Sequence, residues 1–328
     1  MCRIETSGLD GVKGLRTYLD DRLAGVGMGR GRSARLLLDT LGLGLEQTLT
    51  FIGRERPDYD RFVDWILSTA GPPDPLRVMR FNAWTDRAPP PAPVRAWLDG
   101  IEAMDPVLDA DDLDHWEAEG YVILPGAISR AEAAAVEALI WREAGADPDR
   151  PDSWYGPRTN GIMIQRFQHP SMEAARRSPR VHKAFAQLWG TADLWMTTDR
   201  LSFNPPSTQR QSYREPGLHW DVSLARPIPF ATQGILYLTD TAADQGAFRL
   251  VPGFHHRLDA WLDSLEGASP RTVNLDDQAR PVAAKAGDLI IWRNDLPHGA
   301  SRNTGHQPRM AQYVNMYSPD LVTNPVWL

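Results

Sequence analysis

The strongest constraint on the fold is a series of short, aromatic or β-branched segments in the second half of the 328-residue chain. Each segment is bounded by proline, glycine or asparagine, which favour turns and end strands. Segments of this length and spacing predict antiparallel strands in a sandwich or barrel. The predicted strands lie within Gly161–Phe167, Leu194–Phe203, Gln233–Leu238, Ala247–Val251, Asp288–Trp292 and Met310–Tyr317.

The first hundred residues follow a different pattern, with apolar residues at the three- and four-residue spacing of amphipathic helices. This pattern predicts helix over Ser33–Phe51 and over Tyr59–Leu67. The proline-rich run Ala88–Val94 lacks backbone N–H groups and restricts its neighbours, which predicts a stiff linker. We therefore expect a helical N-terminal region over residues 1–105 and a β-rich domain over residues 106–328.

Composition excludes several classes of protein. The single cysteine, Cys2, rules out an intramolecular disulfide and a cysteine-rich zinc site. The formal net charge is -7, and no basic run favours nucleic acid as a partner. The N-terminus lacks the apolar stretch of a secretory signal, and no segment has the roughly 18 apolar residues that span a membrane. We expect a cytoplasmic protein that binds neither nucleic acid nor a membrane.

Three side chains that can bind a metal occur in the β-rich half. His219 and Asp221 stand two residues apart, which on a strand places them on the same face. His298 follows the predicted strand Asp288–Trp292. Two histidines and one carboxylate form the ligand set of non-haem iron(II) oxygenases, in which other coordination positions remain open. The sequence therefore predicts an iron(II) site made of these three residues.

The same residue types also occur without such a function, since isolated histidines commonly pack or cap. His115 and Glu117 repeat the spacing, but we expect them on a helix, where positions i and i+2 diverge. His255 and His256 are adjacent, and adjacent strand residues face opposite ways, so we do not expect them to chelate one ion. Trp220, between the two proposed ligands, is expected to pack in the core.

Several motifs in order resemble the phytanoyl-CoA dioxygenase-like family of iron(II)- and 2-oxoglutarate-dependent oxygenases, over roughly residues 111–318. They are HWEAEGYVILPGAIS from His115, HWD from His219, GAFRLVPGFHH from Gly246, AGDLIIW from Ala286, His298 itself and Arg309. The resemblance implies a mainly β fold with helices: a double-stranded β-helix, the cupin-like jelly-roll, with an N-terminal helical extension. It also implies iron(II), 2-oxoglutarate and dioxygen as cofactor and cosubstrates.

The same resemblance implies two contacts with 2-oxoglutarate. In the family, an arginine at the position of Arg309 grips the distal carboxylate, and a planar, permanently charged guanidinium suits that contact. Relatives often bind the cosubstrate with a serine two residues after the second histidine. Ala300 stands at that position here, so we take the adjacent Ser301 as the candidate. A second departure is Phe254, which replaces the serine of the usual PGSH motif.

These residues predict an oxygenase that hydroxylates an unactivated C–H bond of a small metabolite or natural-product intermediate and releases succinate and carbon dioxide. Desaturation, cyclisation or epimerisation would use the same residues and stay open, as does a non-catalytic or 2-oxoglutarate-independent cupin-type metal-binding protein. We expect a small-molecule partner and either a monomer or a homodimer. Residues expected to line the substrate pocket are Gln165, Arg166, Arg200, Asn204, Tyr213, Arg226 and Asn315.

The N-terminal helices present apolar faces, which include Leu36, Phe62 and Trp65, that must be buried. Two arrangements are open. The helices could cover one flank of the β-rich domain as a scaffold. Alternatively, they could overhang the mouth of the barrel and close the substrate pocket.

Overall fold

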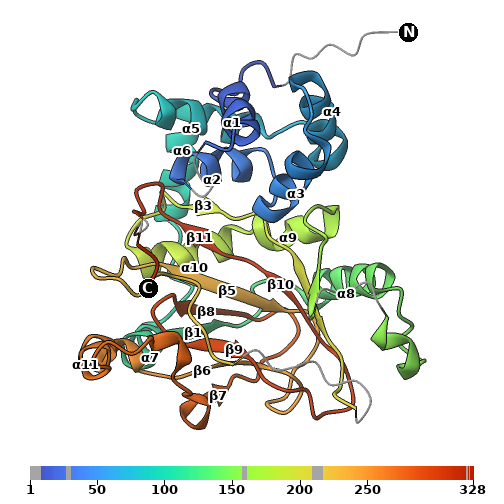
Figure 1. The fold of residues 1–328 in the computed structure, drawn as a ribbon, viewed down its shortest axis with the longest axis vertical. Coiled ribbons are helices and arrows are strands. Elements are labelled where there is room, and N and C mark those ends of the chain that lie inside the picture. Colours follow the sequence, from blue (N-terminus) through green and yellow to red (C-terminus); the bar gives the residue numbers. More distant parts are fainter. Residues whose placement is uncertain (1–8, 27–30, 157–160, 209–216, 323, 325) are drawn as a thin grey trace.

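The computed structural model describes residues 9–26, 31–156, 161–208, 217–322, 324 and 326–328 (Figure 1). The chain combines helices with antiparallel sheets. Its first part is helical and gathers at one end of the molecule, at the top of Figure 1. The helices of this part are α1 (Leu15–Leu23), α2 (Arg32–Thr40), α3 (Leu45–Glu55), α4 (Tyr59–Ala70), α5 (Pro75–Thr85) and α6 (Ala92–Glu102).

The structure corrects two expectations for this region. The predicted helix over Ser33–Phe51 is two helices, because the chain turns after α2 at Gly42, whose φ of 67° favours glycine. The predicted linker Ala88–Val94 is helical from Ala92 onward. Pro93 lies in the first turn of α6, where the missing N–H costs no helical hydrogen bond.

The remaining helices pack around the sheets. They are α7 (Ala110–Glu119), α8 (Arg130–Ala144), α9 (Glu173–Arg176), α10 (Pro179–Trp189) and α11 (Leu258–Ser264). The longest, α8, begins with a capping box in which Ser129 and Glu132 each accept a hydrogen bond from the backbone N–H of the other. Within the part of the chain that the structure describes, no helix combines the length and apolar character needed to cross a membrane.

Antiparallel strands make up the rest of the core. A six-stranded sheet has the order β1-β8-β5-β10-β4-β2, a three-stranded sheet has the order β7-β6-β9, and β11 pairs with β3. Each predicted strand segment overlaps at least one of these strands. Their bounds are β1 (Tyr121–Leu124), β2 (Met163–Ile164), β3 (Trp195–Met196), β4 (Leu201–Asn204), β5 (Thr232–Tyr237), β6 (Phe248–Leu250), β7 (Arg280–Pro281), β8 (Leu289–Arg293), β9 (His298–Ala300), β10 (Arg309–Tyr313) and β11 (Met316–Tyr317).

Alternation along the strands gives the six-stranded sheet two apolar faces. On β8, Leu289 and Ile291 belong to a cluster with residues of α8 and α10. Ile290 and Trp292, which point the other way, pack with Phe248 of β6 in the three-stranded sheet. The large sheet is therefore covered by helices on one face and by the smaller sheet on the other.

A third apolar cluster joins the N-terminal helices to the β-rich part, through Trp195 and Tyr317. A buried polar network reinforces it. The carboxylate of Asp39 on α2 accepts hydrogen bonds from the Thr198 N–H at 2.7 Å, the Tyr317 hydroxyl at 2.8 Å and Arg35 Nε at 2.8 Å. The N-terminal region is thus attached to β3 and β11 by both apolar and charged contacts.

Replacing Asp39 with alanine should lower the free energy of unfolding by about 3 to 5 kcal/mol, the usual cost of breaking a buried charge pair. Burial raises the pKa of Asp39, whereas Arg35 and the hydrogen bonds from Thr198 and Tyr317 oppose that rise. These donors stabilise the buried carboxylate, and removing the carboxylate would leave them without an acceptor. Urea unfolding measures the effect. The exposed Asp64 of α4 is the control: Asp64→Ala should change stability by less than about 0.5 kcal/mol. Equal losses in the two variants would contradict this account.

Candidate metal centre and its cavity

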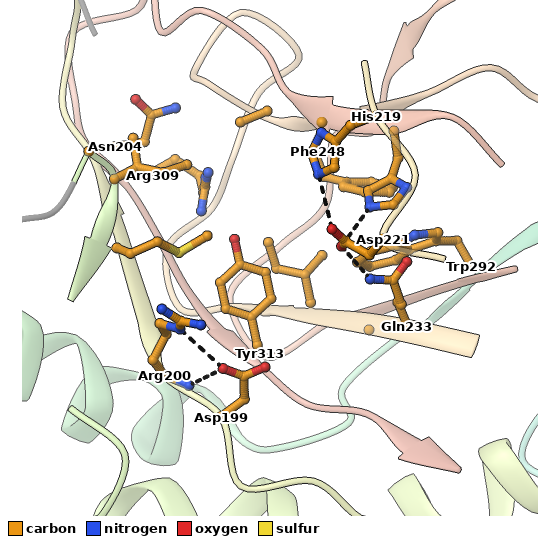
Figure 2. Close-up of a pocket in the computed structure, with 18 of the residues that line it drawn as sticks. Asp199, Arg200, Asn204, His219, Asp221, Gln233, Phe248, Trp292, Arg309 and Tyr313 are labelled. Atoms are coloured by element: carbon orange, nitrogen blue, oxygen red, sulfur yellow. Dashed lines mark hydrogen bonds and ion pairs between the residues drawn. The ribbon is translucent and has the colours of Figure 1, made fainter. Parts of the chain in front are cut away.

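A cavity of about 670 Å³ is lined by residues of both the six-stranded and the three-stranded sheets (Figure 2). Polar side chains in its wall include Asn204 of β4, Gln233 of β5, and Arg309 and Tyr313 of β10. Helix α2 contributes Arg35 to the same wall. The N-terminal helical region therefore reaches this cavity.

Strand register places these polar groups on a common face. In the pairing of β10 with β4, Arg309 lies opposite Asn204. In the pairing of β5 with β8, Gln233 lies opposite Trp292. Tyr313 follows Arg309 by four residues on β10 and so shares its face. Segments far apart in the sequence thus supply one wall.

A backbone bridge joins the two predicted histidine ligands. The His219 N–H donates to the His298 carbonyl at 2.9 Å, and the His298 N–H donates to the His219 carbonyl at 3.0 Å. The expectation that His219 and Asp221 lie on a strand is not met: His219 is an isolated bridge residue, and Asp221 lies in a bend. The side chains of His219 and Asp221 still approach each other (Figure 2), and Asp221 also approaches His298.

The three side chains offer ligand atoms that all lie within 4.8 Å of one another. Nε2 of His219 is 3.6 Å from Asp221 Oδ1, and Nε2 of His298 is 3.4 Å from Asp221 Oδ2. Nδ1 of His298 lies 2.9 Å from the Leu296 carbonyl oxygen, which can only accept, so the neutral ring carries its proton there and presents Nε2. Two imidazole nitrogens and a carboxylate oxygen suit a divalent transition metal.

Electrostatics in this cluster favour the protonation states that metal ligation needs. Burial alone would raise the pKa of Asp221, but its hydrogen bond with His298, the two nearby imidazoles and Gln233 outweigh burial and hold that pKa well below its usual range. Burial lowers the pKa of His219, His298 lowers it further, and Asp221 opposes the shift. At neutral pH the cluster therefore contains an ionised carboxylate beside a neutral imidazole, as a metal site requires.

Gln233 belongs to this cluster, and the sequence analysis did not find it. Its Nε2 donates a hydrogen bond to Asp221 Oδ2 at 2.7 Å (Figure 2). Its Oε1 is buried without a hydrogen-bond partner. A contact of this kind orients a carboxylate ligand and tunes its basicity. No local motif marks Gln233; only the alternation along β5 would have assigned it to the inner face.

Arg309 is held rigidly in the cavity wall and is only 1% exposed. Its Nε donates to the Gly246 carbonyl at 3.0 Å, and its Nη1 donates to Ser202 Oγ at 2.8 Å. Gly246 has a φ of 64°, and a Cβ there would lie 2.3 Å from Nδ2 of Asn204, so this close approach needs glycine. These contacts preorganise the guanidinium and leave Nη2 without a hydrogen bond to the described residues.

Four further predicted contacts line the cavity: Ser301, Arg200, Asn204 and Asn315. Arg200 forms ion pairs with Asp199, at 3.3 Å, and with a glutamate of α3. The Nδ2 of Asn204 donates to the Ser301 carbonyl at 3.3 Å. The side-chain oxygen of Asn315 accepts from a threonine of β5 at 3.2 Å. Asp199, like Arg35, is a lining residue that the sequence analysis did not name.

The other predicted pocket residues are placed elsewhere. Gln165 lies outside the lining set and accepts a hydrogen bond from Arg200 at 3.4 Å. Arg166 is ion-paired with Glu143 at 2.6 Å, and Arg226 is ion-paired with two aspartates of α11. Neither arginine lines the cavity. Tyr213 lies outside the described residues.

Two other histidine pairs do not join the metal cluster. His115 and Glu117 lie on α7, as expected. His255 and His256 lie in a short 3-10 helix, so the expectation that they face opposite sides of a strand is wrong. Their ring centroids are 3.9 Å apart, and both rings contact the Glu117 carbonyl, at 3.0 and 2.9 Å. Among the described residues, only His219, Asp221 and His298 form a group of three possible metal ligands.

The sequence profile described as phytanoyl-CoA dioxygenase (PhyH) matches residues 98–311. The chain belongs to this family. The match includes the metal cluster and Arg309 but begins after α5, so Arg35 lies outside it. This member of the phytanoyl-CoA dioxygenase family therefore draws part of its cavity wall from residues that the family profile does not cover.

Similar proteins include an ectoine dioxygenase of Bordetella parapertussis, 25% identical over 66% of this chain and 78% of that protein. A phytanoyl-CoA dioxygenase-like protein of Dictyostelium discoideum is 23% identical over 45% of this chain, and the match spans about half, 54%, of that protein. Among solved structures, EctD from S. alaskensis with bound Fe gives a TM-score of 0.48 at 19% identity, over 66% of this chain and 79% of that one.

Replacing Gln233 with alanine should weaken divalent-metal binding by about 10- to 100-fold, because Asp221 loses the hydrogen bond that orients it. Calorimetric titration with Mn²⁺ measures this without any turnover. The matched control is Gln307→Ala, since Gln307 is exposed and outside the cavity wall. Metal affinity equal to that of the control would show that Gln233 does not support the ligand.

Proposed function

We propose that the chain is an iron(II)- and 2-oxoglutarate-dependent oxygenase that acts on a small molecule. The observation that carries the proposal is the meeting of His219, Asp221 and His298 in the wall of a cavity that also contains the buried Arg309. A set of three protein ligands leaves coordination positions for a cosubstrate and dioxygen. Membership of the phytanoyl-CoA dioxygenase family and the ectoine dioxygenase relative support the same proposal.

For the core we infer a double-stranded β-helix, the jelly-roll of the cupins, with the N-terminal helices as an extension. Support comes from antiparallel sheets of six and three strands that pack face to face around Trp292 and Phe248. We also infer a division between residues 1–105 and residues 106–328. The family match, which begins at residue 98, is in keeping with that division.

An iron(II) ion bound by the three ligands would supply the redox chemistry of the reaction. That chemistry would convert 2-oxoglutarate and dioxygen into succinate and carbon dioxide and, in the same turnover, oxidise a C–H bond of the substrate. The protein's part is to hold the ligands in place. The bridge between His219 and His298 fixes the two imidazoles. Gln233 orients the Asp221 carboxylate between them.

Arg309 is the proposed anchor for the distal carboxylate of 2-oxoglutarate. Its guanidinium is buried, preorganised by Ser202 and the Gly246 carbonyl, and has a donor left for a ligand. Tyr313 lines the same cavity, and burial raises the pKa of its phenol while Arg309 opposes the rise. A phenol with a raised pKa stays protonated, so it can donate to a carboxylate beside the arginine. Ser301 is a second candidate for this contact, as it also lines the cavity.

The substrate side of the cavity is the region of Arg200, Asp199 and Arg35. In Figure 2, Tyr313 lies between Asp199 and the Asp221 carboxylate. Charged groups there would orient polar groups of a small-molecule substrate, while Arg35 makes the N-terminal region part of the pocket wall. We propose hydroxylation as the outcome. Desaturation, cyclisation or epimerisation remains the alternative, because each uses the same ligands and differs only in how the substrate is held.

The test of the proposed activity is formation of succinate from 2-oxoglutarate, measured with iron(II), ascorbate and a panel of small metabolites. Replacing His298 with alanine removes one of three ligands, so we expect activity to fall at least about 100-fold, beyond the loss caused by a single supporting contact. His306→Ala is the matched control, since His306 is exposed and outside the metal cluster. Retention of succinate formation in His298→Ala would refute the ligand assignment.

Replacing Arg309 with alanine should weaken 2-oxoglutarate binding by about 2 to 4 kcal/mol, the cost of truncating one partner of a buried charge pair. Mn²⁺ affinity should stay within about twofold, because Arg309 does not contact the three ligands. Binding of 2-oxoglutarate to the Mn²⁺-loaded protein is measured by calorimetry, with a melting curve as the check on folding. Arg302 also lines the cavity and is the comparison. A larger loss in Arg302→Ala than in Arg309→Ala would transfer the anchor role to Arg302.

A further inference from the structure

A second cavity, of about 160 Å³, lies where α5 and α6 of the N-terminal region meet α10 and β3. It shares no lining residue with the larger cavity. Its wall has a basic part and an apolar part. The basic part consists of Arg77, Arg80, Arg176 and Arg177, and the apolar part includes Leu76, Trp97, Ile101, Leu194, Met196 and Met316.

Two of these arginines are almost completely buried. The side chain of Arg80 is 8% exposed and that of Arg176 is 4% exposed. Arg80 pairs with Asp193 and donates to the Leu194 carbonyl at 2.9 Å, whereas Arg176 pairs with a glutamate of α9 at 3.0 Å. The Nε atom of each guanidinium is nevertheless buried without a hydrogen-bond partner. A buried donor without an acceptor destabilises the folded protein, and the cost is larger when the donor belongs to a charged group.

Arg77 is a cation with no direct ion pair: its charge acts on Glu173, a carboxylate that is already ion-paired with Arg176 and Arg177. Arg77 is half-buried in the same wall and makes no hydrogen bond or ion pair with the residues that the structure describes. Burial lowers the pKa of Arg80 and of Arg176, and the charge of Arg77 contributes to both shifts. Three like charges therefore meet around a small cavity. Such an arrangement is stabilised by an anion placed among them.

The helix α10 adds a partial positive charge at the same place. Ser178 and Pro179, at its N-terminus, line the cavity. The helix is 11 residues long, and its dipole favours negative charge at this end. The Ser178 side chain accepts a hydrogen bond from Val181 N–H, Pro179 has no N–H, and Ser178 N–H donates to the Ala175 carbonyl at 3.3 Å, so among these first residues only the Arg180 N–H remains available.

Two carboxylates also line the cavity, and both are committed elsewhere. Asp39 accepts hydrogen bonds from Arg35, Thr198 and Tyr317. Asp74 caps α5 by accepting from the Leu76 N–H at 2.8 Å. Neither forms an ion pair with Arg77. Glu173, the acid on which the charge of Arg77 acts, is shared with Arg176 and Arg177, so Arg77 has no carboxylate of its own and can bind an anion from solution.

We propose that this cavity binds a small organic anion, with a carboxylate or phosphate head on Arg77, Arg80 and Arg176 and a short apolar body against Trp97 and Met196. The head would accept hydrogen bonds from the guanidinium of Arg77, while the charges of Arg80 and Arg176 in the same wall attract it. The apolar wall excludes water from one side of the contact, which strengthens it. This site lies outside the catalytic cavity and does not depend on the proposed oxygenase activity.

The experiment is calorimetric titration of the full chain with two probes, inorganic phosphate and hexanoate, at constant ionic strength. We expect saturable binding of one equivalent. Arg77→Gln should weaken that binding at least about tenfold, the worth of one charge-assisted hydrogen bond. Because Arg77 makes no hydrogen bond or ion pair with the described residues and also repels Arg80 and Arg176, the melting temperature should be preserved. Arg54→Gln, on exposed α3 surface of the same region, removes an equal charge and should leave binding unchanged.

The two probes distinguish the head groups and the need for an apolar body. Tighter binding of hexanoate than of phosphate identifies a carboxylic acid, and the reverse identifies a phosphate group. The proposal is overturned if neither probe binds saturably, or if Arg77→Gln binds like Arg54→Gln. It is also overturned if Arg309→Ala, and not Arg77→Gln, abolishes binding, because the anion would then occupy the catalytic cavity.

Discussion

The alternation of side chains across the six-stranded sheet is the constraint on which the rest of the structure depends. On β10, Met310 belongs to the apolar cluster under the helices, whereas Arg309, Ala311 and Tyr313 face the other sheet. A shift of one residue in register would exchange these two sets and bury Arg309 among the helices. The apolar partners of the outer face therefore fix where the polar residues of the inner face can be. The packing of the apolar core thus determines which side chains line the cavity.

The metal cluster depends in addition on the bridge between His219 and His298. His219 lies in a segment with no regular secondary structure, so its position comes from two backbone hydrogen bonds to His298. Trp220 anchors the same segment from the other side: it is buried, and its Nε1 donates to the Asp295 carbonyl at 3.0 Å. Asp221 is thereby returned to the cavity side. The side chains of His219, Trp220 and Asp221 therefore alternate between the cavity and the core as they would on a strand. Three hydrogen bonds, two to His298 and one to Asp295, maintain this alternation in a segment that is not a strand.

Sequence reasoning found the residues whose pattern is local. His219 and Asp221 are two positions apart, and the motif around them could be recognised in one chain. Strand segments were also found, because turn residues bound them. Gln233 was missed because its hydrogen bond to Asp221 depends on how β5 lies against a separate segment. Arg35 was missed for the same reason, since it reaches the cavity from a helix that precedes every strand.

Errors arose where a residue type permits several structures. Arg166 and Arg226 resemble substrate contacts by composition, yet Arg166 is ion-paired with Glu143 and Arg226 with two aspartates of α11. The run of prolines before α6 indicated a linker, although proline is accepted in a first helical turn. His255 and His256 sat in a segment that contains β6, but the chain leaves the strand before it reaches them. In each case the deciding information was tertiary.

Helix α2 connects the two cavities through a single ion pair. Arg35 lines the catalytic cavity, and Asp39, its partner at 2.8 Å, lines the smaller one. A second link runs through Arg176, which lines the smaller cavity and donates to the Asp199 carbonyl at 2.6 Å, while Asp199 also lines the catalytic cavity. Each link includes a buried charged side chain, Asp39 in the first and Arg176 in the second, and Coulomb forces on buried charges are weakly screened. The N-terminal helices therefore do more than cover apolar surface, because they hold one wall of each cavity and the contacts between them.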